Sequence, residues 1–195
     1  MAEIVELPRR VVPQPKPAIH KGGDCSACVL GGVLGIPTVR EVYETFFGGK
    51  PKALSRHEMV AAVEDAEWKL ELLDRVISDI PHWPALPNTQ IWGQPGWGQN
   101  LAWYAYVRMA IDAGYYGIAS ISYAKQGPPA ESDHVVLICG VRVREEPTRI
   151  AKAFKLTHEI LVSCSAAHPE GRWVDHNEFL EAWGGYNVIL VRPAA

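Results

Sequence analysis

The spacing of apolar residues changes along the chain, from helical in the first part to strand-like in the second, and this limits the folds that the sequence can adopt. The predicted helices cover residues 25–34, 38–47, 55–77 and 101–113. The predicted strands cover residues 116–123, 133–144, 153–165 and 187–192, with a turn over 145–148 and a further helix over 175–182. Helices followed by an antiparallel set of strands are typical of the α+β class.

Polar residues mark where the first and third helices begin. Asp24 stands directly before the first apolar run, and aspartate is a preferred N-cap residue. Ser55 is followed three residues later by Glu58, which is the pattern of a capping box. The first helix is therefore expected to begin at Cys25 and the third near Ser55.

Two stretches contain too many prolines and glycines for regular structure. Residues 1–23 are expected to form an extended lead-in over the surface, because proline fixes the backbone and lacks an N–H donor. Residues 78–100 are expected to form a loop, and loops of this length are usually functional or disordered. Its tryptophans argue against disorder. Trp92 and Trp97 either line a substrate groove or pack the loop onto its own body.

Length, composition and charge favour a soluble single domain. The 195 residues, of which 48% are hydrophobic, fit one domain with a full core, spanning residues 1–195. The 19 basic and 22 acidic residues are interspersed and give no single-sign field, so neither nucleic acid nor membrane is expected as a partner. The start lacks a signal-peptide pattern, and no apolar run approaches the ~20 residues of a spanning helix, so a cytoplasmic location is expected.

The four cysteines are too few for a disulfide framework and are expected to be thiols. Cys28 and Cys139 lie among apolar neighbours, which favours burial. Cys25 is expected at a helix start, where free N–H groups and the helix dipole lower the pKa of a thiol. Cys25 is therefore the candidate nucleophile, with a buried, inert thiol as the alternative interpretation.

A thiolate nucleophile needs a proton acceptor that can later protonate the leaving group, and histidine does both near neutral pH. His134 is the best candidate because it opens an apolar strand directly after a polar loop. A sheet would hold its ring at the edge of a cleft. Four other histidines have exposed-looking neighbours and are interpreted as surface residues: His57, His82, His158 and His176.

Cys25 and Cys28 also form a CxxC pair, which suggests two other kinds of site. A redox pair usually follows a strand, but proline-rich sequence precedes this one. A zinc site would need a second ligand pair, which the spacing of the remaining cysteines and histidines does not supply. No metal and no cofactor are therefore expected.

Four segments resemble, in order, the motifs of the C39-like, papain-fold cysteine peptidases. Residues 23–30 (GDCSACVL) resemble the nucleophile motif DCGxACL, and residues 132–140 (SDHVVLICG) resemble the base motif HxVVxxG. Residues 178–186 (EFLEAWGGY) are similar to the C-terminal EFxxxWxGY segment. Residues 114–122 (GYYGIASIS) resemble the glycine and strand that precede the histidine.

This resemblance implies a papain-like α+β fold and a cysteine-dependent amide or acyl hydrolase that needs no cofactor. Cys25 corresponds to the nucleophile and His134 to the general base, and the substrate would be a peptide or another amide. Transfer of the acyl group to an amine is an alternative. A catalytically impaired papain-fold protein that binds a peptide or protein partner is another.

Two helper positions depart from the family. The family has a glutamine six residues before the cysteine, where this chain has Ile19, and the adjacent His20 is the candidate for oxyanion support. The family also places Asp or Asn at the end of the strand after the histidine. That position falls near Cys164, and small shifts in alignment bring Ser163, Ser165 or His168 to it; Ser165 is taken as the third catalytic candidate.

Overall fold

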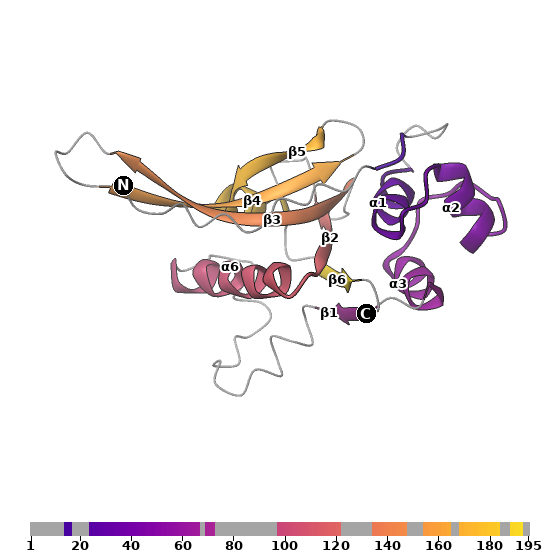
Figure 1. Cartoon of the computed structure of the whole chain (residues 1–195), viewed down its shortest axis with the longest axis horizontal. Helices are drawn as coiled ribbons and strands as arrows, with labels where there is room; N and C mark the ends of the chain where they lie inside the picture. The colour runs from indigo at the N-terminus through magenta and orange to yellow at the C-terminus, as the bar shows by residue number, and fades with distance from the viewer. Residues whose placement is uncertain are drawn as a thin grey trace.

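The computed structural model describes residues 14–16, 24–66, 69–72, 97–121, 134–147, 154–164, 168–183 and 188–192 (Figure 1). The helices in these ranges are α1 (Cys25–Leu34), α2 (Val39–Phe46), α3 (Arg56–Asp65), α6 (Trp97–Asp112) and α7 (His176–Trp183). The strands are β1 (Lys69–Leu72), β2 (Tyr116–Ile121), β3 (His134–Pro147), β4 (Phe154–Cys164), β5 (His168–Asp175) and β6 (Val188–Arg192).

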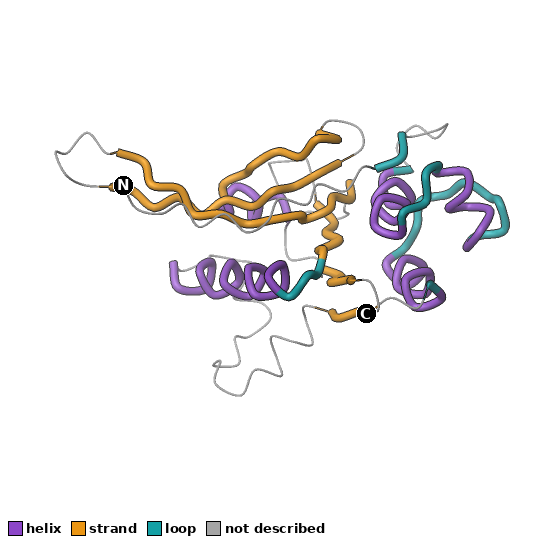
Figure 2. Tube along the Cα trace, viewed as in Figure 1, coloured by secondary structure: helices purple, strands orange, loops and turns teal. Residues whose placement is uncertain are grey.

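The described strands form one six-stranded sheet in the order β1-β6-β2-β3-β4-β5, and neighbouring strands are antiparallel throughout. Three helices, α1 to α3, precede all of these strands in the chain, and α6 precedes all of them except β1. The predicted α+β class, with N-terminal helices followed by an antiparallel sheet, is therefore confirmed. The sheet twists strongly, so that β3 and β4 run along the length of the molecule while β6 and β1 lie beyond the end of α6, on the side of the three N-terminal helices (Figure 2).

Helices cover both faces of the sheet, because alternate residues of its central strands are apolar on both sides. On one face, α1, α2 and α3 form a buried cluster with β2, β3, β4 and β6. On the other face, α6 and α7 form a second cluster with the same strands. In Figure 1 the three N-terminal helices gather at one end of the molecule and α6 lies along the β3–β4 pair.

The helix starts agree with the predicted signals in part. Ser55 and Glu58 form the predicted capping box at the start of α3. Asp24 occupies the N-cap position of α1, but its side chain does not cap the helix. It is 3% exposed, and the Tyr43 hydroxyl of α2 donates a hydrogen bond of 3.0 Å to its Oδ1. The carboxylate therefore joins α1 to α2.

Three predicted boundaries are wrong. The third helix ends at Asp65 rather than at residue 77, and Lys69–Leu72 pairs with β6 instead, because its apolar and polar residues alternate. The predicted turn over 145–148 lies largely within β3, which pairs through Pro147 with Phe154. The predicted loop over 78–100 overlaps α6, which begins at Trp97; residues 78–96 lie outside the described ranges.

One strand, β5, was absent from the sequence prediction. Its sequence, HPEGRWVD, has few apolar residues and a glycine, so it lacks the alternation that marks a strand. It forms one edge of the sheet and owes its conformation to pairing with β4.

Candidate active site

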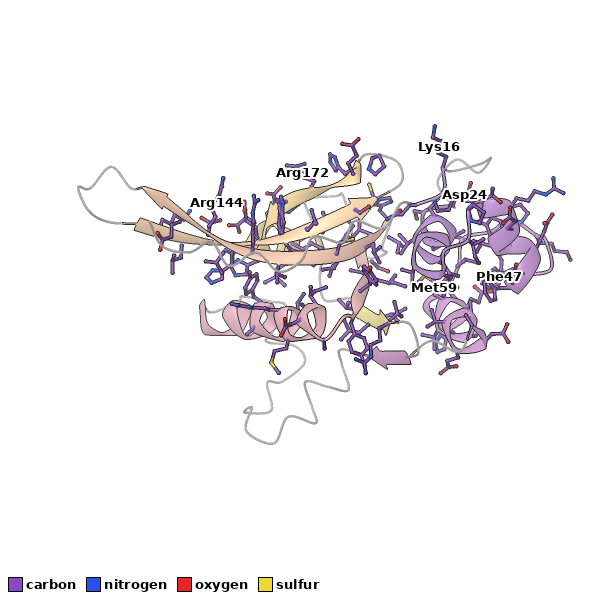
Figure 3. The ribbon with its side chains drawn as sticks, in the orientation of Figure 1. Lys16, Asp24, Phe47, Met59, Arg144 and Arg172 are labelled. Atoms are coloured by element: carbon purple, nitrogen blue, oxygen red, sulfur yellow. The ribbon has the colours of Figure 1, made fainter. Side chains whose placement is uncertain are left out.

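Cys25 is the first residue of α1, as predicted, and is the one partly exposed cysteine of the four, all of which lie in the described ranges. Cys28 and Cys139 are buried, which confirms their predicted role as core residues. The start of α1 is fixed by two contacts. Tyr43 binds Asp24, and the backbone N–H of Leu54 donates to the hydroxyl of Ser26. Asp24, labelled in Figure 3, marks this end of the helix.

His134 is the first residue of β3 and lies opposite Ile121 of β2 in the sheet. It is 8% exposed. Because α1 packs against β3, the Cys25 thiol reaches the His134 imidazole and the two side chains are hydrogen-bonded. The two residues predicted to work as a pair are therefore in contact.

Opposing effects act on the Cys25 thiol. Burial raises its pKa and is the largest single effect, but the hydrogen bond and the positive charge of His134 lower it. The backbone N–H groups of Val135 and Ser26 donate to the sulfur and lower the pKa further. The pKa of Cys25 is below that of an ordinary thiol as a result.

The imidazole of His134 is shifted in the opposite direction. Burial disfavours the cation and lowers its pKa, but hydrogen bonds to Cys164 and Cys25, together with electrostatic attraction to both sulfurs, raise the pKa to about 9. A depressed thiol pKa and an elevated imidazole pKa favour a thiolate–imidazolium pair at neutral pH. The site can therefore supply a nucleophile and a proton donor together.

Cys164 is the last residue of β4 and is one of the two cysteines that raise the pKa of His134. It was one of the alternatives for the third position. Ser163 is fully buried and bonds to Gln14 and to the Pro169 carbonyl. His168 begins β5 and is paired with Cys164 in the sheet. Ser165, the assigned candidate, lies outside the described residues and stays a prediction.

The side chains of three other candidate residues lie outside the part of the chain that the structure describes. His20 and Trp92 lie outside the described residues. Trp97 begins α6, and only its backbone is described. Oxyanion support by His20 and a tryptophan-lined groove therefore stay predictions.

Sequence reasoning missed a contribution from the lead-in. Gln14 Nε2 donates to the carbonyl oxygen and to the hydroxyl of Ser163, with both distances 3.2 Å. The next residue, Pro15, is buried against α1 where a glycine, Gly31, leaves room for it: a Cβ there would lie 2.8 Å from the proline ring. The only feature of the sequence that could have indicated this role is the position of Gln14 between two prolines.

The interpretation of His176 as a surface residue is wrong. It is 6% exposed, and its ring lies 5.7 Å from that of Tyr104 and 5.5 Å from that of His158, which is itself partly buried. His176 begins α7, which contacts α6 and β4. Its burial depends on this tertiary contact, which its polar sequence neighbours do not indicate.

The described residues contain no group of three or more His, Cys, Asp or Glu side chains arranged to hold a metal ion. Among the described helices, none is by itself long and apolar enough to cross a membrane. The pair α1 and α2 meets that length and composition together, and the two helices are bent by 85°.

The fold and the site define an α+β protein with a helix-start thiol bound to a buried histidine. No protein-family model and no curated protein matches the chain. It is similar to the solved peptidase domain of Streptococcus ComA, a bi-functional ABC transporter of a quorum-sensing pathway, with 12% identity over 93% of this chain and 99% of that one, and a TM-score of 0.48. It is also similar to a double-glycine-motif protease of an AMS/PCAT transporter, solved in complex with its leader peptide, with 9% identity over 97% and 98% of the two chains and a TM-score of 0.46.

Proposed function

We propose that this chain is a papain-like cysteine hydrolase of peptide or related acyl bonds, with Cys25 as nucleophile and His134 as general base and acid. The observation that carries the proposal is the contact between the partly exposed Cys25 thiol and the buried His134 ring at the start of α1. The four sequence motifs, which occur in family order, support it independently.

The proposed reaction starts with the thiolate. Its sulfur attacks the carbonyl carbon of the substrate, and the carbonyl electrons move to oxygen. The N–H of Cys25, at the first position of α1, is free of helix bonds and is proposed to bind that oxygen. His134 then gives its proton to the leaving amine, which departs and leaves a thioester on Cys25.

Hydrolysis completes the cycle. Neutral His134 takes a proton from a water molecule, whose oxygen attacks the thioester carbonyl. The carboxylic acid leaves, the thiolate is restored, and His134 holds the proton as before. An amine acceptor in place of water would make the protein an acyltransferase, and analysis of the product distinguishes the two.

The experiment that tests this proposal combines labelling with turnover. A peptidyl vinyl sulfone or chloromethyl ketone should alkylate Cys25 selectively, and a library of fluorogenic peptides should be cleaved by the wild type but not by Cys25→Ala. Cys28→Ala serves as a matched control, because that thiol is fully buried in the same helix. Labelling spread equally over the cysteines, or cleavage that survives Cys25→Ala, would contradict the proposal.

A second candidate is a papain-fold protein that binds a peptide without turning it over. The observation in its favour is that the group contacting His134 from β4 is the Cys164 thiol and not a carboxylate or an amide. A thiol is a weak hydrogen-bond acceptor. Selective labelling of Cys25 without cleavage of any library peptide would favour this second function.

A further inference from the structure

Tyr43, a buried residue of α2, contacts the residue that precedes the proposed nucleophile. Tyr43 is 2% exposed, and its hydroxyl oxygen lies 3.0 Å from Asp24 Oδ1 and 2.9 Å from the Lys52 carbonyl oxygen. Burial, and after it the hydrogen bond and charge of Asp24, raise the pKa of Tyr43, so the hydroxyl keeps its proton and is a donor at neutral pH. Tyr43 therefore joins the residue before Cys25 to the segment that leads into α3.

Ser26 makes a similar connection on the other side of the nucleophile. The backbone N–H of Leu54 donates to the Ser26 hydroxyl over 3.1 Å, and both residues are buried. The motif DCGxACL has a glycine at this position, and glycine has no hydroxyl to accept such a bond. Residues 52–54 are therefore bonded to both neighbours of Cys25, to Ser26 directly and to Asp24 through Tyr43.

The peptide unit between Asp24 and Cys25 contains the N–H that is proposed to bind the oxyanion. Its carbonyl accepts from the Cys28 N–H at 2.8 Å, as the first bond of α1. The C=O and N–H of a trans peptide point in opposite directions, so the Cys25 N–H points out of the helix at its N-terminus. A misplacement of ~1 Å at a reacting group can cost ~100-fold in rate, so the orientation of this peptide matters.

We propose that Tyr43 and Ser26 are positioning residues for Cys25, which hold the Asp24–Cys25 peptide so that its N–H meets the oxyanion of the substrate. The inference rests on the proposed function and deepens it. Ile19 stands where the resembled family has a glutamine, and its apolar side chain cannot donate to an oxyanion. More of that stabilisation therefore depends on the backbone.

The test removes one hydroxyl at a time from the full chain, with Tyr43→Phe and Ser26→Ala. Tyr104→Phe is the matched control for the first variant, because Tyr104 is 4% exposed and its hydroxyl donates to a backbone carbonyl of β3 at 2.7 Å. Ser55→Ala is the control for the second, because the Ser55 hydroxyl also accepts from a backbone N–H, at the start of α3. Neither control residue bonds to a neighbour of Cys25.

The readouts are kcat and KM for a cleaved peptide and the rate at which iodoacetamide alkylates Cys25. Alkylation joins the sulfur to carbon and releases iodide, so no oxyanion forms in that reaction. Tyr43→Phe and Ser26→Ala should lower kcat about 10-fold at unchanged KM, a part of the ~100-fold loss that follows removal of an oxyanion donor, and should leave alkylation within about twofold of wild type. Both controls should keep the wild-type kcat.

Three results would overturn the inference. The first is an unchanged kcat in Tyr43→Phe and Ser26→Ala, and the second is an equal loss of kcat in Tyr104→Phe and Ser55→Ala. The third is alkylation that slows by the same factor as kcat, because the effect would then lie in the thiolate and not in the oxyanion.

A peptide aldehyde provides a readout that needs neither turnover nor a variant. The Cys25 sulfur bonds to the aldehyde carbon, and the electrons of the carbonyl bond move to oxygen with no group leaving. In the wild type the Cys25 amide proton should move downfield in NMR spectra when this adduct forms, and an amide proton that does not move would overturn the inference. Failure of the proposed function is distinguishable, because Cys25 would then label no faster than the other thiols and form no adduct.

Discussion

Replacement of His134 by glutamine should remove most of the reactivity of Cys25 at acidic pH. Glutamine keeps a polar side chain of similar reach but carries no charge, so the hydrogen bond and attraction that lower the pKa of Cys25 are lost. The N–H groups of Val135 and Ser26 remain, and so does burial, which acts in the opposite direction and is the larger influence. The thiol should therefore return to an ordinary pKa or rise above it.

The size of the effect follows from the fraction of thiolate. An ordinary thiol with a pKa of about 8.5 is ~0.3% ionised at pH 6, so complete ionisation in the wild type would correspond to a ratio of ~300 between the two proteins. A thiolate of lower pKa is also a weaker nucleophile, which offsets part of this advantage. We expect iodoacetamide to alkylate Cys25 in the wild type about 10- to 100-fold faster than in His134→Gln at pH 6.

The assay follows alkylation of the peptide that contains Cys25 by mass spectrometry between pH 5 and 9. His57→Gln is the matched control, since that histidine is exposed on α3 and the substitution is the same. The control should behave as the wild type does. Equal rates for wild type and His134→Gln at pH 6, with both folded, would refute the reasoning.

Three further predictions concern stability and the lead-in. Ser55→Ala removes the capping box of α3 and should lower the free energy of unfolding by ~1 kcal/mol in urea titrations, with Cys25 labelling unchanged. Burial lowers the pKa of His176 below its unfolded value, so the stability it contributes is present above about pH 6.5 and is lost as the pH falls through the folded pKa. The unfolding free energy of His176→Gln should thus depend less on pH between 7 and 5 than that of the wild type, and equal slopes would exclude this cause. Gln14→Ala should lower the unfolding free energy by ~0.5–1.5 kcal/mol and slow peptide cleavage, and cleavage at the wild-type rate would show that the lead-in does not support the site.

Local signals in the sequence sufficed for the main parts of the site. Cys25 begins a helix because an apolar run starts beside it, and His134 begins a strand because apolar residues follow it without a break. Both features depend on neighbours in the sequence. The contact between the two side chains was inferred from a resemblance to known motifs, and it is present in the structure.

Features that depend on distant parts of the chain could not be predicted in the same way. Leu70 and Leu73 continue the helical spacing of α3, whereas Leu70 and Leu72 alternate with charged residues as in a strand. Pairing with β6 decides between the two for this segment. The third position of the site was ambiguous for a related reason. The β4–β5 register shifts between Val162 and Cys164. Such an irregularity changes the direction of the side chains that follow it, and the sequence does not indicate where it occurs. Counting along β4 therefore could not choose between Cys164 and its neighbours.

The contact between α1 and β3 has a consequence for how folding can be followed. Cys25 and His134 lie far apart in the sequence, and contacts of that kind form late because a long segment must first be closed. An isolated α1 would lack the imidazolium that activates its thiol. A short pulse of alkylating reagent at pH 6 during refolding should therefore label Cys25 only in molecules whose helix has already docked onto the sheet. The fraction of Cys25 labelled at each refolding time then measures how far this docking step has progressed.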